Sequence, residues 1–339
     1  MKDATLDDST LAAAVEPAGT APSHRAWPLA ASARRTVAGP VCVQGIGLHS
    51  GATVTLTLRP AAADNGLWIR RTDITDRDPM IPARWDHVVD TRLCTALGNA
   101  AGVTVSTVEH LMAALAALGV DNAEILVDGP ELPVMDGSSA AFVAEIEAVG
   151  TVAQAAPRHA IRLVDTVSVT EGDSTVSLRP APRGLTIDAE IDFENPVIGR
   201  QRRVVLVSAR SFREELADAR TFGFRHEVDG LRAMGLARGG SLDNAVVVDG
   251  DTILNPEGLR YADEFVRHKA LDALGDLYLA GHPLIGVYQG LRPSHRINNL
   301  LLRALFDQPE AWRFEPALLS GGYGAGRGRF DPASDRRRA

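Results

Sequence analysis

TVTLTLRPA (Thr53–Ala61) and DSTVSLRPA (Asp173–Ala181) are close copies of one another, and this internal echo decides the fold. Each stretch alternates apolar with polar residues and ends at a proline, which is typical of a strand with one buried face. The two copies begin 120 residues apart (173 − 53). Self-similarity at such a spacing indicates a duplicated structural unit, so a fold has to be sought for each half separately.

Each half also contains a long helical pattern followed by a short apolar strand. The first half has STVEHLMAALAALG and then NAEILVDG, and the second has DEFVRHKALDALGDLYLAG and then PLIGVYQG. The sequence therefore predicts an α+β protein of two duplicated domains, each a small β-sheet packed with helices, with the helices facing each other across the interface. His110 and His268 are 158 residues apart (268 − 110), so the second copy carries an insertion of about 38 residues.

These observations predict how the chain is divided. The predicted parts are a disordered leader over residues 1–33, a first domain over 34–155, a second domain over 156–312 with an insert near 211–260, and a flexible tail over 313–339. The leader and the tail lack helical or strand periodicity. The Pro-containing segment TVAQAAPRH is expected to link the domains.

The composition excludes several classes of protein. The chain of 339 residues is 45% hydrophobic, which suits a globular core, and no apolar run is long enough to span a membrane. A net charge of −8 argues against a general nucleic-acid binder. Two cysteines, Cys42 and Cys94, suit a reducing compartment, and we expect the cytoplasm. No obligate protein partner is evident.

The helical stretch DEFVRHKALDALGD, residues 263–276, carries more chargeable groups than a core helix needs. At about 100° per residue, His268, Asp272 and Asp276 fall on one face. A solvated polar face would explain this equally well. Gly275 lies beside that face, and because glycine weakens a helix by about 1 kcal/mol relative to alanine, it indicates a close approach to the backbone.

A metal site needs more ligands than the pair His268 and Asp272. His110 occupies the equivalent helix of the first half, and it would complete a set of three ligands with a position left for water. Glu109 could then act as general base. It could instead form an S-x-x-E capping box with Ser106, and His110 alone would more often be a core histidine.

A proton donor for the leaving group is the remaining requirement of such a site. His295, at a loop-to-helix boundary in RPSHRINNLLLRAL, is the candidate acid, and Asp276 could orient it and hold it protonated. Two other functions fit part of this pattern. Two histidines and a carboxylate also form the ligand set of ferrous-iron oxygenases, and a sugar-nucleotide binding protein could carry a structural metal.

Several motifs, in order and spacing over residues 34 to 310, resemble the UDP-3-O-acyl-N-acetylglucosamine deacetylases of lipid A biosynthesis. They are GIGLHSG, STVEHLMAAL, MDGSSAAFV, ARTFGF, GGSLDNAVVVD, DEFVRHKALDALGDLYL and SHRINN. The resemblance implies a two-domain α+β duplication with an insert in each domain. It also implies a zinc-dependent hydrolase that removes the N-acetyl group of the UDP-sugar, with ferrous iron as a possible cellular metal.

The resemblance assigns a role to each candidate residue. The zinc ligands would be His110, His268 and Asp272. Glu109 would be the general base, Thr221 of ARTFGF would stabilise the oxyanion, His295 would protonate the leaving nitrogen, and Asp276 would support His295. The residues implied to contact the substrate are Lys269, His49, Leu93, Cys94, Phe193, Phe222 and Gly240. Among these, Cys94 fits a small buried hydrophobe as well, and Phe193 fits a core phenylalanine nearly as well.

Overall fold

The computed structural model describes residues 32–317, so the predicted leader and tail lie almost wholly outside the described residues. The first half is built on a five-stranded sheet. Its strands, in order across the sheet, are β2 (Val41–Ile46), β3 (Thr53–Pro60), β9 (Ala123–Val127), β4 (Leu67–Arg71) and β5 (Met80–Pro82). Val54, Leu56 and Leu58 are the buried residues of β3, which confirms the alternation of the first copy.

The second half repeats this order of five strands within a seven-stranded sheet. The order is β12 (Val167–Glu171), β13 (Ser174–Arg179), β19 (Leu284–Leu291), β14 (Leu185–Asp192) and β15 (Arg200–Leu206). The middle strands of the two orders are β9 and β19, each the last of its five in the sequence. Each is antiparallel to one neighbour, β3 or β13, and parallel to another, β4 or β14. The matching order and direction confirm the predicted duplication.

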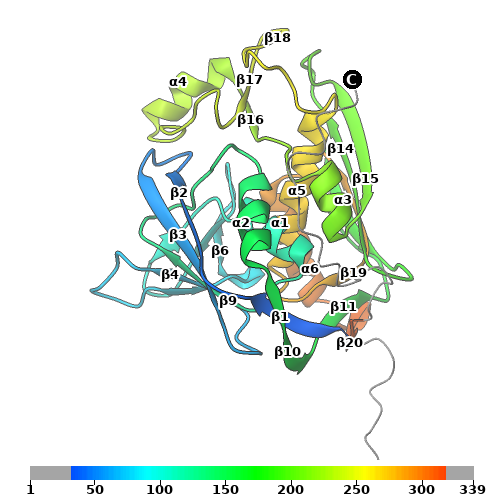
Figure 1. The fold of residues 1–339 in the computed structure, drawn as a ribbon. Coiled ribbons are helices and arrows are strands. Elements are labelled where there is room, and N and C mark those ends of the chain that lie inside the picture. The colour runs from blue at the N-terminus through cyan, green and yellow to red at the C-terminus, as the bar shows by residue number, and fades with distance from the viewer. Residues whose placement is uncertain (1–31, 318–339) are drawn as a thin grey trace, which may run out of the picture.

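Two helices of each half pack between these sheets. The first half has α1 (Glu109–Leu118) and α2 (Ala140–Val149), and the second has α5 (Glu264–Tyr278) and α6 (His295–Phe306). Figure 1 shows α1 and α5 side by side at the centre of the molecule, with one sheet on either side. The helices therefore face each other across the interface, as predicted.

Gly275 is where α1 and α5 come closest. A Cβ atom added to Gly275 would lie 2.0 Å from the backbone oxygen of Glu109, a distance that no real Cβ contact tolerates. The predicted close approach to the backbone is confirmed, and the neighbour is the first residue of α1. Leu111, Met112 and Leu271 are fully buried around this crossing, in a core that is continuous between the halves.

Each half carries an additional small sheet. In the first half, β6 (Val88–Asp90), β7 (Ala96–Gly98) and β8 (Thr104–Val105) form one, with a short 3-10 helix before it, η1 (Trp85–His87). In the second half, the segment predicted as the insert near 211–260 holds α3 (Ala209–Glu215), β16 (Phe222–Phe224), α4 (Arg225–Ala233), β17 (Val246–Asp249) and β18 (Thr252–Ile253). Its three strands form a separate sheet at the top of Figure 1.

Most of the segment TVAQAAPRH, expected to link the domains, is a strand. Here β10 (Thr151–Pro157) pairs antiparallel with β1 (Ala33–Val37), and the guanidinium of Arg35 donates to the hydroxyl of Thr151. The second half repeats this pair as β11 (His159–Leu163) and β20 (Trp312–Pro316), the latter preceded by η2 (Pro309–Ala311). The partner of β10 is β1, which is distant in the sequence. The Ala- and Pro-rich composition of the segment therefore gives no local indication of a strand.

The two edge pairs also bring the ends of the described chain together. The backbone N–H of Ser32 donates to the carbonyl of Ala317 over 2.7 Å. The packed chain thus runs through β20, past the residue 312 at which the second domain was expected to end. Within residues 32–317, none of the helices has both the length and the apolar character needed to cross a membrane.

Candidate metal centre

His110, His268 and Asp272 converge at the crossing of α1 and α5. One ligand atom from each of the three lies within 4.8 Å of the other two. Oδ1 of Asp272 is 3.4 Å from Nε2 of His268 and 3.7 Å from Nε2 of His110. All three side chains are buried, and the two imidazole rings meet edge to face with their centroids 5.0 Å apart. His110, the residue predicted as the third ligand, therefore does lie beside His268 and Asp272.

Hydrogen bonds leave the facing atoms of this cluster available. Nδ1 of His268 donates to the carbonyl of Ala219 over 3.0 Å, so Nε2 carries the lone pair. Oδ2 of Asp272 accepts from Lys269 over 2.8 Å. Oδ1 of Asp272, although buried, has no hydrogen-bond partner among the described residues. A buried carboxylate oxygen without a donor is costly, and a cation bound between it and the two imidazoles would remove that cost.

The protonation states also suit a metal ion. Burial, together with the neighbouring His268, lowers the pKa of His110 to about 3. Burial would raise the pKa of Asp272, but His268 and Lys269 outweigh it and hold that pKa below its usual range. Neutral imidazole and ionised carboxylate are the forms that bind metals.

Glu109 does not cap its helix. The residue at the N-cap of α1 is Val108 with no side-chain cap, and the hydroxyl of Ser106 donates to the carbonyl of Pro130 instead. The alternative of an S-x-x-E capping box is therefore wrong. Oε2 of Glu109 accepts from the backbone N–H of Thr95 over 3.0 Å. Burial raises the pKa of the Glu109 carboxyl to about 7, the range that suits a general base at neutral pH.

His295 faces Glu109 from the first turn of α6. Nε2 of His295 is 3.8 Å from Oε1 of Glu109, and its Nδ1 donates to Oδ2 of Asp276 over 3.0 Å. Burial alone would lower the pKa of His295, but the carboxylates of Asp276 and Glu109 outweigh it and raise that pKa to about 9. A buried imidazolium thus lies across from a carboxyl that can accept a proton.

Asp276 is held by further donors on both oxygens. Its Oδ1 accepts from the hydroxyl of Thr95 over 2.6 Å, and its Oδ2 accepts from the side-chain amide of Asn298 over 2.9 Å. Asn298 in turn accepts from the buried hydroxyl of Tyr288 over 2.7 Å. This network fixes the orientation of the carboxylate that His295 depends on.

The segment before β16 forms a further side of the cluster. Thr221 is the second residue after Ala219, and its backbone is bonded to Gly137 on one side and to Val246 on the other. The ring of Phe222 lies 6.4 Å from that of His268 and 5.7 Å from Nζ of Lys269. The ARTFGF motif is thus anchored beside the candidate metal ligands of α5.

The other predicted substrate contacts lie in different environments. Burial raises the pKa of Cys94 to about 12, with Glu109 adding to the effect, so this thiol is unreactive and lies near the base. Leu93 before it is exposed. Burial lowers the pKa of His49, and Glu131 and His295 are the charges nearest to it. Phe193 packs edge to face on Phe222 with their centroids 5.8 Å apart.

The loop of His49 also meets the insert of the second half. The backbone N–H of Gly239 donates to the carbonyl of Leu48 over 3.0 Å, and a Cβ on Gly239 would lie 2.2 Å from the oxygen of Gly47. A Cβ on the next residue, Gly240, would lie 3.6 Å from a methyl carbon of Leu48. The two halves therefore also touch here, and Gly240 is at this contact.

Two groups of the site leave no signal in the sequence, and a third could have been found. The two are the carbonyl of Ala219 and Thr95, which directly precedes β7 and lies 14 residues before Glu109. Asn298 could have been found, because it follows His295 by three residues and shares its helix face.

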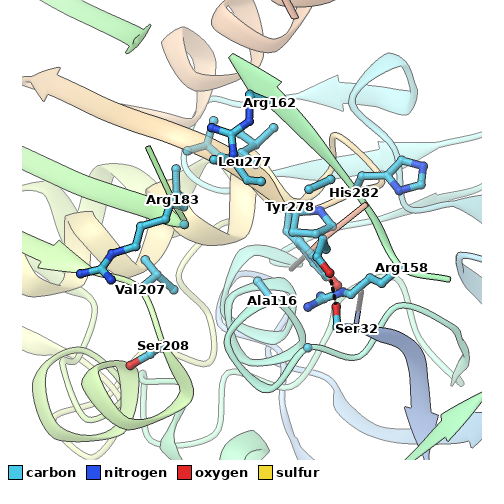
Figure 2. Close-up of a pocket in the computed structure, with 18 of the residues that line it drawn as sticks. Ser32, Ala116, Arg158, Arg162, Arg183, Val207, Ser208, Leu277, Tyr278 and His282 are labelled. Carbon is cyan, nitrogen blue, oxygen red and sulfur yellow. Dashed lines mark hydrogen bonds between the residues drawn. The ribbon is translucent and has the colours of Figure 1, made fainter. Parts of the chain in front are cut away.

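A cavity of about 420 Å³ lies away from this site, beyond the C-terminal halves of α1 and α5. Figure 2 shows Tyr278 and Leu277 of α5 and Ala116 of α1 among its lining residues, with Arg158, Arg162 and Arg183 around them. Arg158 is paired with Asp121, and none of the metal ligands lines this space. It is a separate feature from the candidate metal centre.

Comparison with known proteins agrees with this geometry. A curated protein of Phenylobacterium zucineum (strain HLK1), named UDP-3-O-acyl-N-acetylglucosamine deacetylase, is 53% identical over 280 residues, which are 83% of this chain and 95% of that protein. Proteins of the same name from Myxococcus xanthus (strain DK1622) and Acidithiobacillus ferrooxidans (strain ATCC 53993 / BNL-5-31) are each 50% identical, over 84% and 83% of this chain and 90% and 92% of their own length. The profile of one family matches residues 34–307. The chain belongs to the UDP-3-O-acyl N-acetylglycosamine deacetylase family.

Proposed function

We propose that this chain removes the acetyl group from UDP-3-O-acyl-N-acetylglucosamine, giving the free amine and acetate, as a step of lipid A biosynthesis. The observation that carries the proposal is the placement of two proton-transfer groups, Glu109 and His295, 3.8 Å apart beside a buried set of metal ligands. Amide hydrolysis needs one group that accepts a proton from water and one that donates a proton to the leaving nitrogen. The family membership supports the same reaction.

The metal that we propose for His110, His268 and Asp272 is zinc. Two imidazoles and one carboxylate are a common ligand set for a catalytic zinc ion with an open position. When bound, the ion would supply Lewis acidity that polarises the amide carbonyl and the attacking water. The unpaired Oδ1 of Asp272 and the free Nε2 of His268 support the fit.

Glu109 is proposed as the base that takes the proton from the attacking water. Its pKa of about 7, raised by burial, leaves a substantial ionised fraction at neutral pH. The N–H of Thr95 holds one oxygen of the carboxylate, so Oε1 is the oxygen turned toward His295 and available for the proton.

His295 is proposed as the acid for the amine, because its pKa of about 9 keeps it protonated at neutral pH. Asp276 orients the ring through Nδ1, so that Nε2 carries the transferable proton. Thr221 is proposed to donate to the oxyanion of the tetrahedral intermediate. Its anchored backbone and its place next to Phe222 support this role.

The remaining residues are proposed to position the substrate. Lys269 is charged, since Asp272 outweighs the effect of burial and raises its pKa, and it suits a polar group of the sugar. Phe193, Phe222 and Gly240 are proposed to border the nucleotide and the acyl chain, as are His49, Leu93 and Cys94. Cys42 and Cys94 are both free thiols, and we propose the cytoplasm as the location.

Acetate release tests this function directly. The full chain, purified and loaded with one equivalent of zinc, is incubated with UDP-3-O-acyl-N-acetylglucosamine, and acetate and free amine are measured together with oxygen consumption. We expect equal amounts of acetate and amine and no consumption of oxygen. A zinc-loaded protein that binds the substrate and releases no acetate would contradict the proposal, and oxygen-dependent turnover with ferrous iron would favour an oxygenase instead.

A further inference from the structure

Thr95 uses all its polar groups to connect the two proton-transfer groups of the site. It immediately precedes β7, in the small sheet of the first half. Its backbone N–H donates to Glu109 over 3.0 Å, and its hydroxyl donates to Asp276 over 2.6 Å. Its carbonyl accepts from the N–H of Val108, the N-cap residue of α1, over 3.3 Å. One residue therefore bonds to the carboxylates of both halves.

The described residues around Thr95 leave no other donor that could replace its hydroxyl at Asp276. The residue is 1% exposed, so water cannot replace its hydroxyl if that hydroxyl is removed. The 2.6 Å bond to Asp276 is charge-assisted, and such bonds are about twice as strong as neutral ones. Nothing else among the hydrogen bonds of the described residues reaches Oδ1 of Asp276, because His295 and Asn298 both bond to Oδ2.

The geometry points to a positioning role: Thr95 fixes the base Glu109 and the carboxylate of Asp276 relative to each other, and so aligns His295 for proton donation. This inference rests on the proposed deacetylation. It adds that the base and the acid are aligned by one common residue rather than separately by their own helices. Two helices that belong to different halves can shift against each other, and a shared third element limits that shift.

The hydroxyl and the N–H of Thr95 have separable effects. Replacement by valine removes the donor to Asp276 and keeps the backbone N–H that serves Glu109. Oδ1 of Asp276 is then buried without a donor, so the carboxylate is less firmly held and can turn away from His295. His295 thereby loses part of the negative charge that keeps it protonated. The other titratable groups around His295 stay in place, and they are Glu109, Asp272, His49, His110 and His268.

The first test measures turnover and metal content of zinc-loaded full-length variants. We expect T95V to keep one zinc per chain and a KM close to that of the wild type, and to lose about 10- to 100-fold in kcat, since a small misplacement of catalytic groups costs this much. T95S retains the hydroxyl and should stay within about threefold of the wild type. The matched control is T104V on β8 of the same small sheet, because the hydroxyl of Thr104 makes no hydrogen bond among the described residues, and it should not change kcat.

The second test does not depend on turnover. Ring signals of ¹⁵N-labelled histidine, with His295 assigned from a His295→Gln variant, give the pKa of His295 in each zinc-loaded protein. We expect T95V to lower this pKa by about one unit, given that a hydrogen bond to a charged group is worth roughly one to two such units. T95S should leave it unchanged. If T95V does not fold, T95A serves the same purpose with the same expectations.

Two outcomes would overturn the inference. One is a T95V protein with wild-type kcat and a wild-type pKa of His295. The other is a T95V protein that loses kcat only in proportion to lost zinc, with His295 titrating normally, because that is a purely structural effect. Failure of the deacetylation itself would be recognised separately, as a wild-type protein that releases no acetate while its His295 pKa still responds to T95V.

Discussion

The helices α1 and α5 are copies of one element, and yet they contribute unequally to the site. When His110 is aligned with His268, the positions of Asp272 and Asp276 on α5 correspond to Ala114 and Leu118 on α1. The buried part of α1 is apolar apart from Glu109 and His110. In contrast, α5 buries two carboxylates that lie beside histidines, Asp272 next to His268 and Asp276 next to His295.

This difference shows how two copies of one structural unit can supply complementary parts of a single site. Buried charges are costly unless they are paired, and each on α5 has a partner. Lys269 pairs with Asp272, and Glu264 at the start of α5 pairs with Arg220. The first half contributes the imidazole of His110, the carboxyl group of Glu109 and the donors of Thr95. Either half alone holds an incomplete site.

Loss of either imidazole is expected to have the largest effect. If both helices hold the metal, H110A and H268A should each abolish stoichiometric zinc binding and lower kcat/KM by about 1000-fold or more, since several kcal/mol of charge stabilisation are lost. Metal analysis of the purified variants and acetate release measure this. A variant of α1 that retains zinc and activity would show that α5 binds the metal without its twin.

The residue before each histidine is the next point of comparison. Glu109 precedes His110, and Arg267 precedes His268, where Arg267 pairs with Asp263. E109Q should keep zinc and lose about 100- to 10,000-fold in kcat because the base is removed. R267A is the control, and it should retain zinc and most of kcat. Equal losses in the two variants would mean that Glu109 acts through structure rather than through proton transfer.

The crossing of the helices can be disturbed at Gly275. In G275A the new methyl carbon would meet the backbone of Glu109, so the helices must separate. We expect a loss of about 100-fold in kcat, as for a misplacement near 1 Å, together with a lower melting temperature. The control is G230A in α4, where a Cβ meets nothing within 4 Å and should stabilise the helix by about 1 kcal/mol. A G275A protein with unchanged activity would show that the crossing distance is not critical.

The pH dependence of the rate tests the role of Asp276, a carboxylate that has no counterpart on α1. The proposed acid His295 must be protonated, so kcat/KM should fall as the pH rises through about 9. In D276N the negative charge is lost, the pKa of His295 falls, and this limb should move to lower pH, with about tenfold lower activity at pH 8. A descending limb that stays near pH 9 in D276N would assign the acid to another group.

The features that could be predicted from the sequence depend on residues close to each other in the chain. The strand pattern of Thr53–Pro60, the face of α5 and the close approach at Gly275 all follow from periodicity within one element. The convergence of His110 with α5 followed from the internal echo, which places equivalent helices at one interface.

The features that could not be predicted depend on contacts between distant segments. The Ala- and Pro-rich segment Thr151–Pro157 becomes a strand because β1 lies beside it. Glu109 forms no capping box with Ser106, because its carboxylate accepts from the N–H of Thr95 instead. Thr95 itself carries no local pattern, since its role exists only after both halves have packed.

The hydrogen bond between Ser32 and Ala317 has a consequence for the order of the halves along the chain. Adjacent ends favour circular permutation. A short linker from Ala317 to Ser32, with new ends opened between Pro157 and Arg158, would yield a polypeptide in which the second half is synthesised first. Every strand pairing and every ligand would be conserved in that permuted protein, so the genetic order of the two halves is separable from the architecture they form.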